Sequence, residues 1–198
     1  MLILGHVGIT FGVALAANSL SPQSRVDSAR HVHAPYAQVQ RAIVSLARRV
    51  DLRLLLLGSL LPDIIDKPVG LMLFSDVFGT GRLFSHALVF PIALAVAGVW
   101  LYRCRRSSLL LVLACGAGMH LVLDAMWQTP SILLWPFAGP LPRGVEANGW
   151  LARILAALLT NPAAFVPEII GGMLLMPLMR AICRGGGMNR FLRAGVVE

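Results

Sequence analysis

The stretch SSLLLVLACGAGMHLVLDAMW, residues 107–127, decides how this chain folds. Its length is close to the about 20 residues that an apolar α-helix needs to cross a bilayer. A histidine and an aspartate interrupt it, His120 and Asp124, and their spacing of four residues places them on one face of a helix. Because ionisable groups are costly inside a membrane and usually mark a site or a pathway, the stretch predicts a membrane helix that carries function.

The composition of the whole chain also indicates a membrane protein. Of 198 residues, 57% are hydrophobic and 13% are charged, and the mean hydropathy is +0.76. Soluble domains average about 25% charged residues, so the shortfall points to long runs inside a bilayer. Three scattered cysteines form neither a disulfide framework nor a CxxC zinc motif, so any metal site must rest on other ligands.

Five apolar segments are expected to be helices, at residues 2–20, 54–65, 83–103, 107–127 and 162–179. They predict an all-α, multi-pass transmembrane bundle of about five helices, in a single membrane-embedded domain over residues 1–198. The first segment lacks the basic residues of a signal peptide, so we expect it to be retained. The second is only about 18 Å long, so it needs tilt or local bilayer thinning to cross.

Basic residues predict the orientation of these helices. The net charge of +8 comes from sixteen arginines and one lysine, which flank the apolar segments rather than indicating a nucleic-acid partner. Thirteen of them lie in a loop at 21–53, between the third and fourth segments, and in a tail at 180–198. By the positive-inside rule these regions are cytoplasmic, which predicts a prokaryotic cytoplasmic (inner) membrane protein in contact with the lipid bilayer.

The candidate functional residues share the opposite, outer side. With this topology, the outer ends of four segments carry His6, Asp63, Asp66, His86, His120 and Asp124. The charge bias alone gives the topology, so their convergence on one leaflet independently indicates a site. Imidazole and carboxylate without thiolate favour a divalent metal, most of all zinc, with manganese possible. The alternative is that His120 and Asp124 simply satisfy each other by a hydrogen bond.

Other polar residues have open roles. Glu168 lies several residues into the last segment, where it is a candidate acid or base or the partner of an arginine. Lys67 and Arg82 flank the acids, and either neutralise them or bind an anionic substrate. His31 and His33 could chelate a metal as HVH, but a flexible loop makes this a weak signal.

Several short motifs occur in order: GH near the start, LLGSLLPDIIDKP (56–68), GRLFSHAL (81–88), HLVLDAMWQTP (120–130) and LLWPFAGP (133–140). Over roughly residues 1–140 the chain resembles the membrane-bound metal-dependent hydrolase family (LexA-binding, inner-membrane hydrolase-like proteins), itself similar to the zinc phospholipase C and P1 nuclease group. The resemblance implies metal ligands at His6, Asp63, His86, His120 and Asp124. Many relatives read PDID and then HRGxTHS, whereas here an extra isoleucine separates the aspartates and Gly81 and Ala87 replace two motif residues. At most one or two metals are supported.

Three functions follow from these features. The favoured one is a hydrolase at the outer face, in which metal-activated water attacks a phosphoester or lipid-like substrate; the phosphoester rests on the resemblance. Asp66 or Glu168 would then be the general base, and Arg82 and Lys67 would hold the phosphate. A metal-ion transporter needs polar residues at mid-depth, which 83–103 and 107–127 lack. A non-enzymatic scaffold or regulator, binding a cytosolic protein through loop 21–53, would leave the outer-face residues without a purpose.

Overall fold

A computed structural model of the chain describes residues 2–19, 41, 43–46, 50–144, 149–183 and 187–194. These described residues form helices, turns and coil, with no strand among them. The long helices are α1 (Ile3–Ser19), α4 (Leu52–Pro68), α5 (Val89–Arg105), α6 (Leu109–Leu123) and α9 (Pro162–Cys183). The predicted all-α class and its helical segments are therefore confirmed. His31, His33 and most of the basic loop lie outside the described residues.

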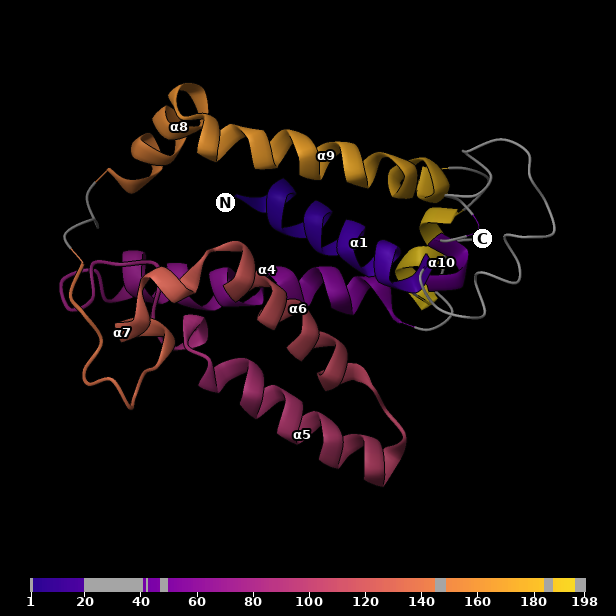
Figure 1. Ribbon diagram of the computed structural model, residues 1–198, viewed down its shortest axis with the longest axis horizontal. Coiled ribbons are helices and arrows are strands. Elements are labelled where there is room, and N and C mark those ends of the chain that lie inside the picture. Colours follow the sequence, from indigo (N-terminus) through magenta and orange to yellow (C-terminus); the bar gives the residue numbers. More distant parts are fainter. Residues whose placement is uncertain are drawn as a thin grey trace.

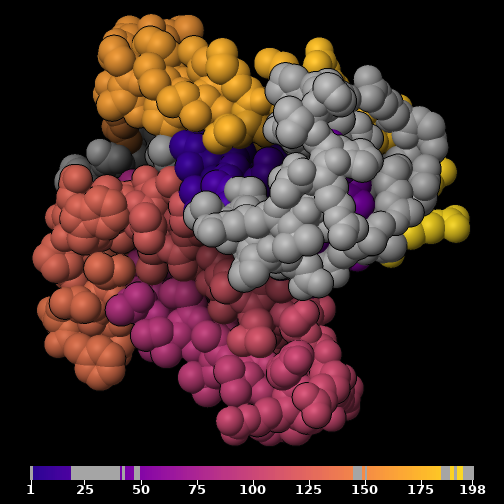
Figure 2. All heavy atoms as spheres, turned by 45° about the vertical axis from the view of Figure 1, so that its right-hand side comes forward, coloured from indigo at the N-terminus to yellow at the C-terminus, as the bar shows by residue number. Residues whose placement is uncertain are grey.

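The long helices pack in pairs (Figure 1). α9 lies beside α1, α4 lies between α1 and α6, and α5 packs on α6. The N-terminus, α7 (Pro130–Leu133) and α8 (Trp150–Thr160) lie at one end of the molecule, and α10 (Gly187–Ala194) lies at the other. The turn between α5 and α6 projects from the rest of the molecule (Figure 2). The molecule therefore has two distinct ends, joined by the long helices.

Glycines allow two of these helix pairs to pack at close range. A Cβ atom at Gly8 of α1 would collide with the backbone of Gly171 on α9. A Cβ atom at Gly116 of α6 would lie 2.6 Å from the carbonyl oxygen of Leu55 on α4, and one at Gly58 would lie 2.7 Å from the carbonyl oxygen of Leu113. Small residues at such crossings let helix backbones touch, as is common between membrane helices.

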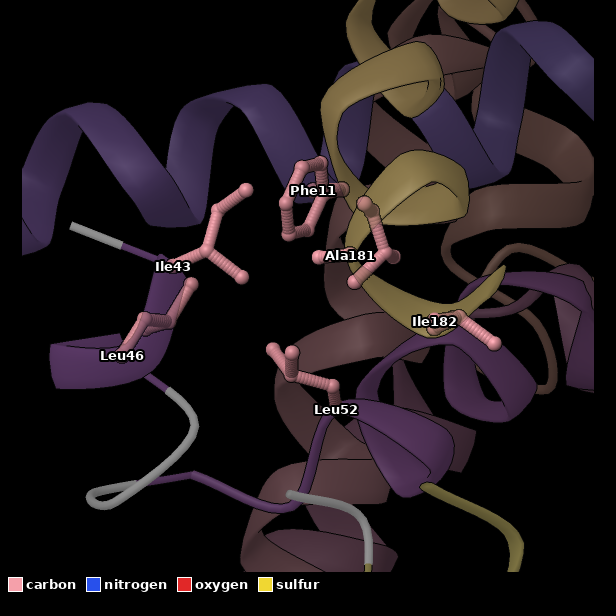
Figure 3. Close-up of a cluster of buried hydrophobic side chains, with 7 residues drawn as sticks. Phe11, Ile43, Leu46, Leu52, Ala181 and Ile182 are labelled. Carbon is pink, nitrogen blue, oxygen red and sulfur yellow. The ribbon is translucent and has the colours of Figure 1, made fainter. Parts of the chain in front are cut away.

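An apolar cluster holds together the end of the molecule that includes α10. Figure 3 shows its side chains coming together from α1, the start of α4, the end of α9 and residues 43–46. The buried members are Phe11, Ile43, Leu46, Leu52, Leu178, Ala181 and Ile182. Apolar packing therefore secures this end of the molecule.

Two predicted helix boundaries are wrong. α5 begins at Val89 rather than at residue 83, because residues 84–86 form a separate 3₁₀ turn, η2 (Phe84–His86). α6 ends at Leu123 rather than at 127, since Asp124 is its C-cap and Ala125 adopts a left-handed conformation with φ of 51° before the short η3 (Met126–Gln128). α4 runs over Leu52–Pro68 and is itself longer than the predicted 54–65, and η1 (Val69–Leu73) continues it. α8 was not predicted.

One described helix is long and apolar enough to span a membrane by length and composition. It is α9, with 22 residues and a mean hydropathy of 1.5 in its most apolar window. Ile3–Asn18, Leu109–Leu123 and Leu151–Thr160 are apolar but shorter. A 17-residue helix extends only about 25 Å, against a hydrocarbon core of ~30 Å. The multi-pass bundle of five spanning helices therefore stays a prediction.

Candidate metal centre

The five predicted metal ligands lie together at the end of the molecule opposite the apolar cluster. His6 lies near the start of α1, Asp63 in the last turns of α4, His86 in η2, His120 near the end of α6, and Asp124 at its C-cap. One potential ligand atom from each of His6, His120 and Asp124 lies within 4.8 Å of the others, and the same holds for Asp63, His86 and His120. All three histidines are fully buried.

Each of the three imidazole rings is oriented by a hydrogen bond at its Nδ1 atom. These bonds join His6 to the Leu2 carbonyl oxygen (2.8 Å), His86 to the Asp66 carboxylate (2.8 Å) and His120 to the Ser59 carbonyl oxygen (2.7 Å). A carbonyl or carboxylate oxygen only accepts, so Nδ1 carries the proton in every ring. In a neutral imidazole the Nε2 atom then presents a lone pair, which is the usual arrangement of a metal-binding histidine.

These Nε2 atoms face one another and the two carboxylates. The Nε2 atoms of His86 and His120 are 3.2 Å apart, and the Nε2 atom of His6 is 3.1 Å from an Asp124 oxygen. The other carboxylate, Asp63, has an oxygen 3.6 Å from the Nε2 atom of His86. Lone pairs this close repel unless a proton or a metal ion lies between them. Two nitrogens bound to tetrahedral zinc are roughly 3.3 Å apart, so the donor set fits such an ion.

Asp66 orients the cluster rather than joining it. Its side chain is fully buried, and its oxygens accept hydrogen bonds from the backbone N–H groups of Leu83 (2.6 Å), Ser85 (3.3 Å) and His86 (3.2 Å) as well as from the His86 ring. These bonds form the η2 turn and fix the His86 ring. A carboxylate so enclosed has no access to a substrate, so its position does not support the role of general base considered from the sequence.

The Glu168 carboxylate likewise accepts hydrogen bonds from backbone N–H groups. Its two oxygens accept hydrogen bonds from the N–H groups of Leu2 (2.6 Å) and Gly5 (3.1 Å). These donors belong to the first turn of α1, where N–H groups have no partner within the helix. Glu168 thus connects α9 to the start of α1, and it lies outside both groups of metal-ligating side chains.

Lys67 and Arg82 bind the outer oxygens of the two carboxylates. The Nζ atom of Lys67 is 2.6 Å from Oδ2 of Asp63, and the guanidinium of Arg82 is 2.9 Å from Oδ2 of Asp124. In both aspartates the other oxygen, Oδ1, faces the histidines. Burial raises the pKa of Asp124, but the facing His6 ring and the charge of Arg82 outweigh it, so the pKa lies below its usual range.

His86 shows the opposite balance. Burial lowers its pKa, but the nearby Asp63 carboxylate and the hydrogen bond to Asp66 raise it more, so the pKa lies above its usual value.

A pocket of about 540 Å³ opens next to the cluster. Asp63 and Asp124 line it together with Lys67 and Arg82, so the carboxylates lie between the buried histidines and the pocket. The opposite wall comes from α8 and the start of α9 and includes Arg153. The sequence reasoning missed this wall, although WLARILAALLT (150–160) has the apolar spacing of an amphipathic helix.

The fold and the cluster define a class: a helical membrane protein with a buried group of histidines and carboxylates at one end. Within it, the chain belongs to the YdjM inner membrane protein family, whose family model matches residues 1–188. The protein is therefore an inner membrane protein, as predicted, and the lipid bilayer is its surroundings. No curated protein and no solved structure matches the chain.

Proposed function

We propose that this protein is a metal-dependent hydrolase that spans the inner membrane several times and has its site at the outer face. One observation carries the proposal: three buried histidines use Nδ1 to donate hydrogen bonds and turn their Nε2 atoms toward one another and toward two carboxylates. Charge also supports the orientation, because Arg103 and Arg105 end α5 whereas His86 precedes it.

His6, Asp63, His86, His120 and Asp124 would hold the ion, with zinc favoured over manganese by the imidazole-rich donor set. His120 has one nitrogen left for a metal, and both groups of donors need it. We therefore expect one tightly bound ion per chain. When bound, a divalent ion supplies activation of water and polarisation of the bond to be cleaved.

The remaining polar residues have supporting roles in this proposal. Lys67 and Arg82 line the pocket beside the two carboxylates, where their charges would hold an anionic phosphoester or lipid-like substrate. Asp66 positions the His86 ring, and Glu168 positions the start of α1 and with it His6. A phosphoester is favoured by these cations, since they bind phosphate well.

Metal content tests the proposal first. The full-length protein, purified in detergent and dialysed, should retain about one equivalent of zinc or manganese by inductively coupled plasma mass spectrometry. The double variant His120→Ala/Asp124→Ala should lose it while its helical circular dichroism is kept. The variant His31→Ala/His33→Ala should retain the metal, because it removes only the alternative chelating motif, HVH, and none of the proposed ligands.

Hydrolysis by the loaded protein is the second test. Wild type with metal should cleave a chromogenic phosphodiester or phosphomonoester, and the double variant should not. Absence of metal after incubation with excess zinc would overturn the proposal and favour the non-enzymatic scaffold or regulator. Metal binding without hydrolysis of any phosphoester or lipid would instead favour the metal-ion transporter.

A further inference from the structure

α8 is the element of the pocket that the proposed chemistry does not use. Arg153, Ile154 and Ala157 of this helix line the pocket, opposite the wall formed by Asp63 and Asp124. At 100° per residue these three positions share one face of the helix. α8 therefore presents a defined inner face, with one positive charge, to the site.

The other face of α8 is apolar and open. Leu151, Leu155 and Leu159 recur every four residues on the side away from the pocket, and they are 55%, 52% and 82% exposed. Asn161 alone separates α8 from α9, the helix that is long enough to span the membrane. Because α8 is joined directly to a helix that can span the membrane, and an exposed apolar face suits the membrane surface, lipid is the surrounding that we expect to cover these leucines.

The pocket itself combines charge with apolar surface. Three cationic side chains, those of Lys67, Arg82 and Arg153, line it together with the carboxylates of Asp63 and Asp124. Leu2, Leu71 and Ile154 contribute apolar side chains. Such a lining matches a ligand with an anionic head and an apolar remainder.

We propose that α8 lies in the membrane–water interface at the outer face of the inner membrane, with its leucines in the lipid. We further propose that the pocket takes the head group of an anionic phospholipid, which Arg153 contacts. The inference that this lipid is a substrate rests on the hydrolase function proposed above. Its binding does not, because the cations and the apolar wall belong to the chain itself.

Lipid binding is measured directly, without turnover. Full-length protein treated with a metal chelator is mixed with phosphatidic acid or with phosphatidylcholine, and bound lipid is counted by native mass spectrometry. We expect one phosphatidic acid to be retained, and Arg153→Gln to weaken its binding by about tenfold. Arg143→Gln is the matched control, because Arg143 is exposed and does not line the pocket.

Two outcomes of this experiment would overturn the proposal. Equal binding by wild type and Arg153→Gln would show that Arg153 does not contact the head group. Displacement of the lipid by an equal concentration of glycerol 3-phosphate would show that the ligand is a water-soluble phosphate rather than a lipid. Because metal is absent throughout, neither outcome bears on the proposed metal site.

The position of α8 has its own test. The three cysteines, Cys104, Cys115 and Cys183, are exposed and are first replaced by serine. An environment-sensitive fluorophore is then attached at Leu155→Cys or at Ala157→Cys in vesicles that contain lipids with brominated acyl chains. We expect strong quenching at 155 and weak quenching at 157, which lines the pocket. No quenching at 155, or equal quenching at both positions, would overturn the interfacial placement.

Discussion

Asp63 and Asp66 lie three residues apart on one helix, yet their surroundings give them different roles. The Asp63 side chain is 14% exposed, lines the pocket and bonds to Lys67. Asp66 is fully buried and accepts backbone N–H groups and the His86 ring. At the residue scale, Asp63 is thus placed as a candidate metal ligand, whereas Asp66 is placed to orient a candidate ligand, the His86 ring.

Replacing Asp66 should weaken metal binding without removing a ligand. Asp66→Asn replaces one carboxylate oxygen by an NH₂ group that faces N–H donors and no longer holds the His86 ring firmly. We expect zinc affinity to fall about 10- to 100-fold, as for other residues that orient metal-binding histidines. Competition with a chromogenic chelator measures it. Asp76→Asn, in an exposed turn, should leave affinity unchanged; unchanged affinity in Asp66→Asn would remove the positioning role.

Substitutions at Glu168 distinguish two roles for this residue: a cap of the α1 N-terminus, or an acid or base in the reaction. Glu168→Ala removes both acceptors of the α1 N-terminus, so we expect it to destabilise the protein by about 0.5–2 kcal/mol. Glu168→Gln keeps one oxygen and should destabilise it less. Thermal melting in detergent gives the comparison. If Glu168→Gln melted like wild type yet abolished turnover, Glu168 would be an acid or base in the reaction instead.

At the scale of elements, the α4–α6 crossing sets the position of His120. Gly58 and Gly116 meet there at backbone contact, one turn before His120 bonds to the Ser59 carbonyl oxygen. The spacing of the two helices and the orientation of that ring are therefore coupled. A side chain at this crossing must push the helices apart, because backbone atoms fill the space.

Two glycines of α6 give a matched pair of variants. Gly116→Ala places a methyl group 2.6 Å from the Leu55 carbonyl oxygen, whereas Gly118→Ala meets nothing within 4 Å. Both changes raise helix propensity by about 1 kcal/mol, so only packing differs. We expect Gly116→Ala to lower the melting temperature and the bound metal, and Gly118→Ala to preserve or raise stability. Equal behaviour of the pair would mean that the crossing does not position His120.

At the scale of the whole molecule, the site and the apolar cluster lie at opposite ends of the long helices. The site meets the starts of α1, α5 and α9 and the ends of α4 and α6, so successive long helices run in opposite directions. That is the arrangement predicted from the arginines. Exposed apolar residues on α5, such as Val96 and Trp100 at 66% each, suit contact with lipid.

Cysteine labelling tests the proposed topology. Cys104 lies near the end of α5 opposite the site, and Arg143 lies at the site end, beyond α7. In intact cells, a membrane-impermeant maleimide should label Arg143→Cys in a protein otherwise free of cysteine. With Cys104 as the single cysteine, labelling should require permeabilised cells. Labelling of both from outside would contradict the multi-pass arrangement.

The sequence by itself determined the helical class, the five long helices and the choice of metal-ligand candidates. Apolar run length and arginine placement are local properties, so they can be read without coordinates. Even the sharing of one end by His6, Asp63, His86, His120 and Asp124 followed from the alternating direction of the helices.

Only the tertiary structure decided what each polar residue contacts there. Asp66 and Glu168 accept hydrogen bonds from N–H groups at the starts of η2 and α1, and these contacts join residues up to 166 positions apart. The same holds for Arg153, which α8 brings to the pocket. Spacing along one helix places side chains on a face, but the partner that fills each hydrogen bond comes from another helix, and packing alone selects it.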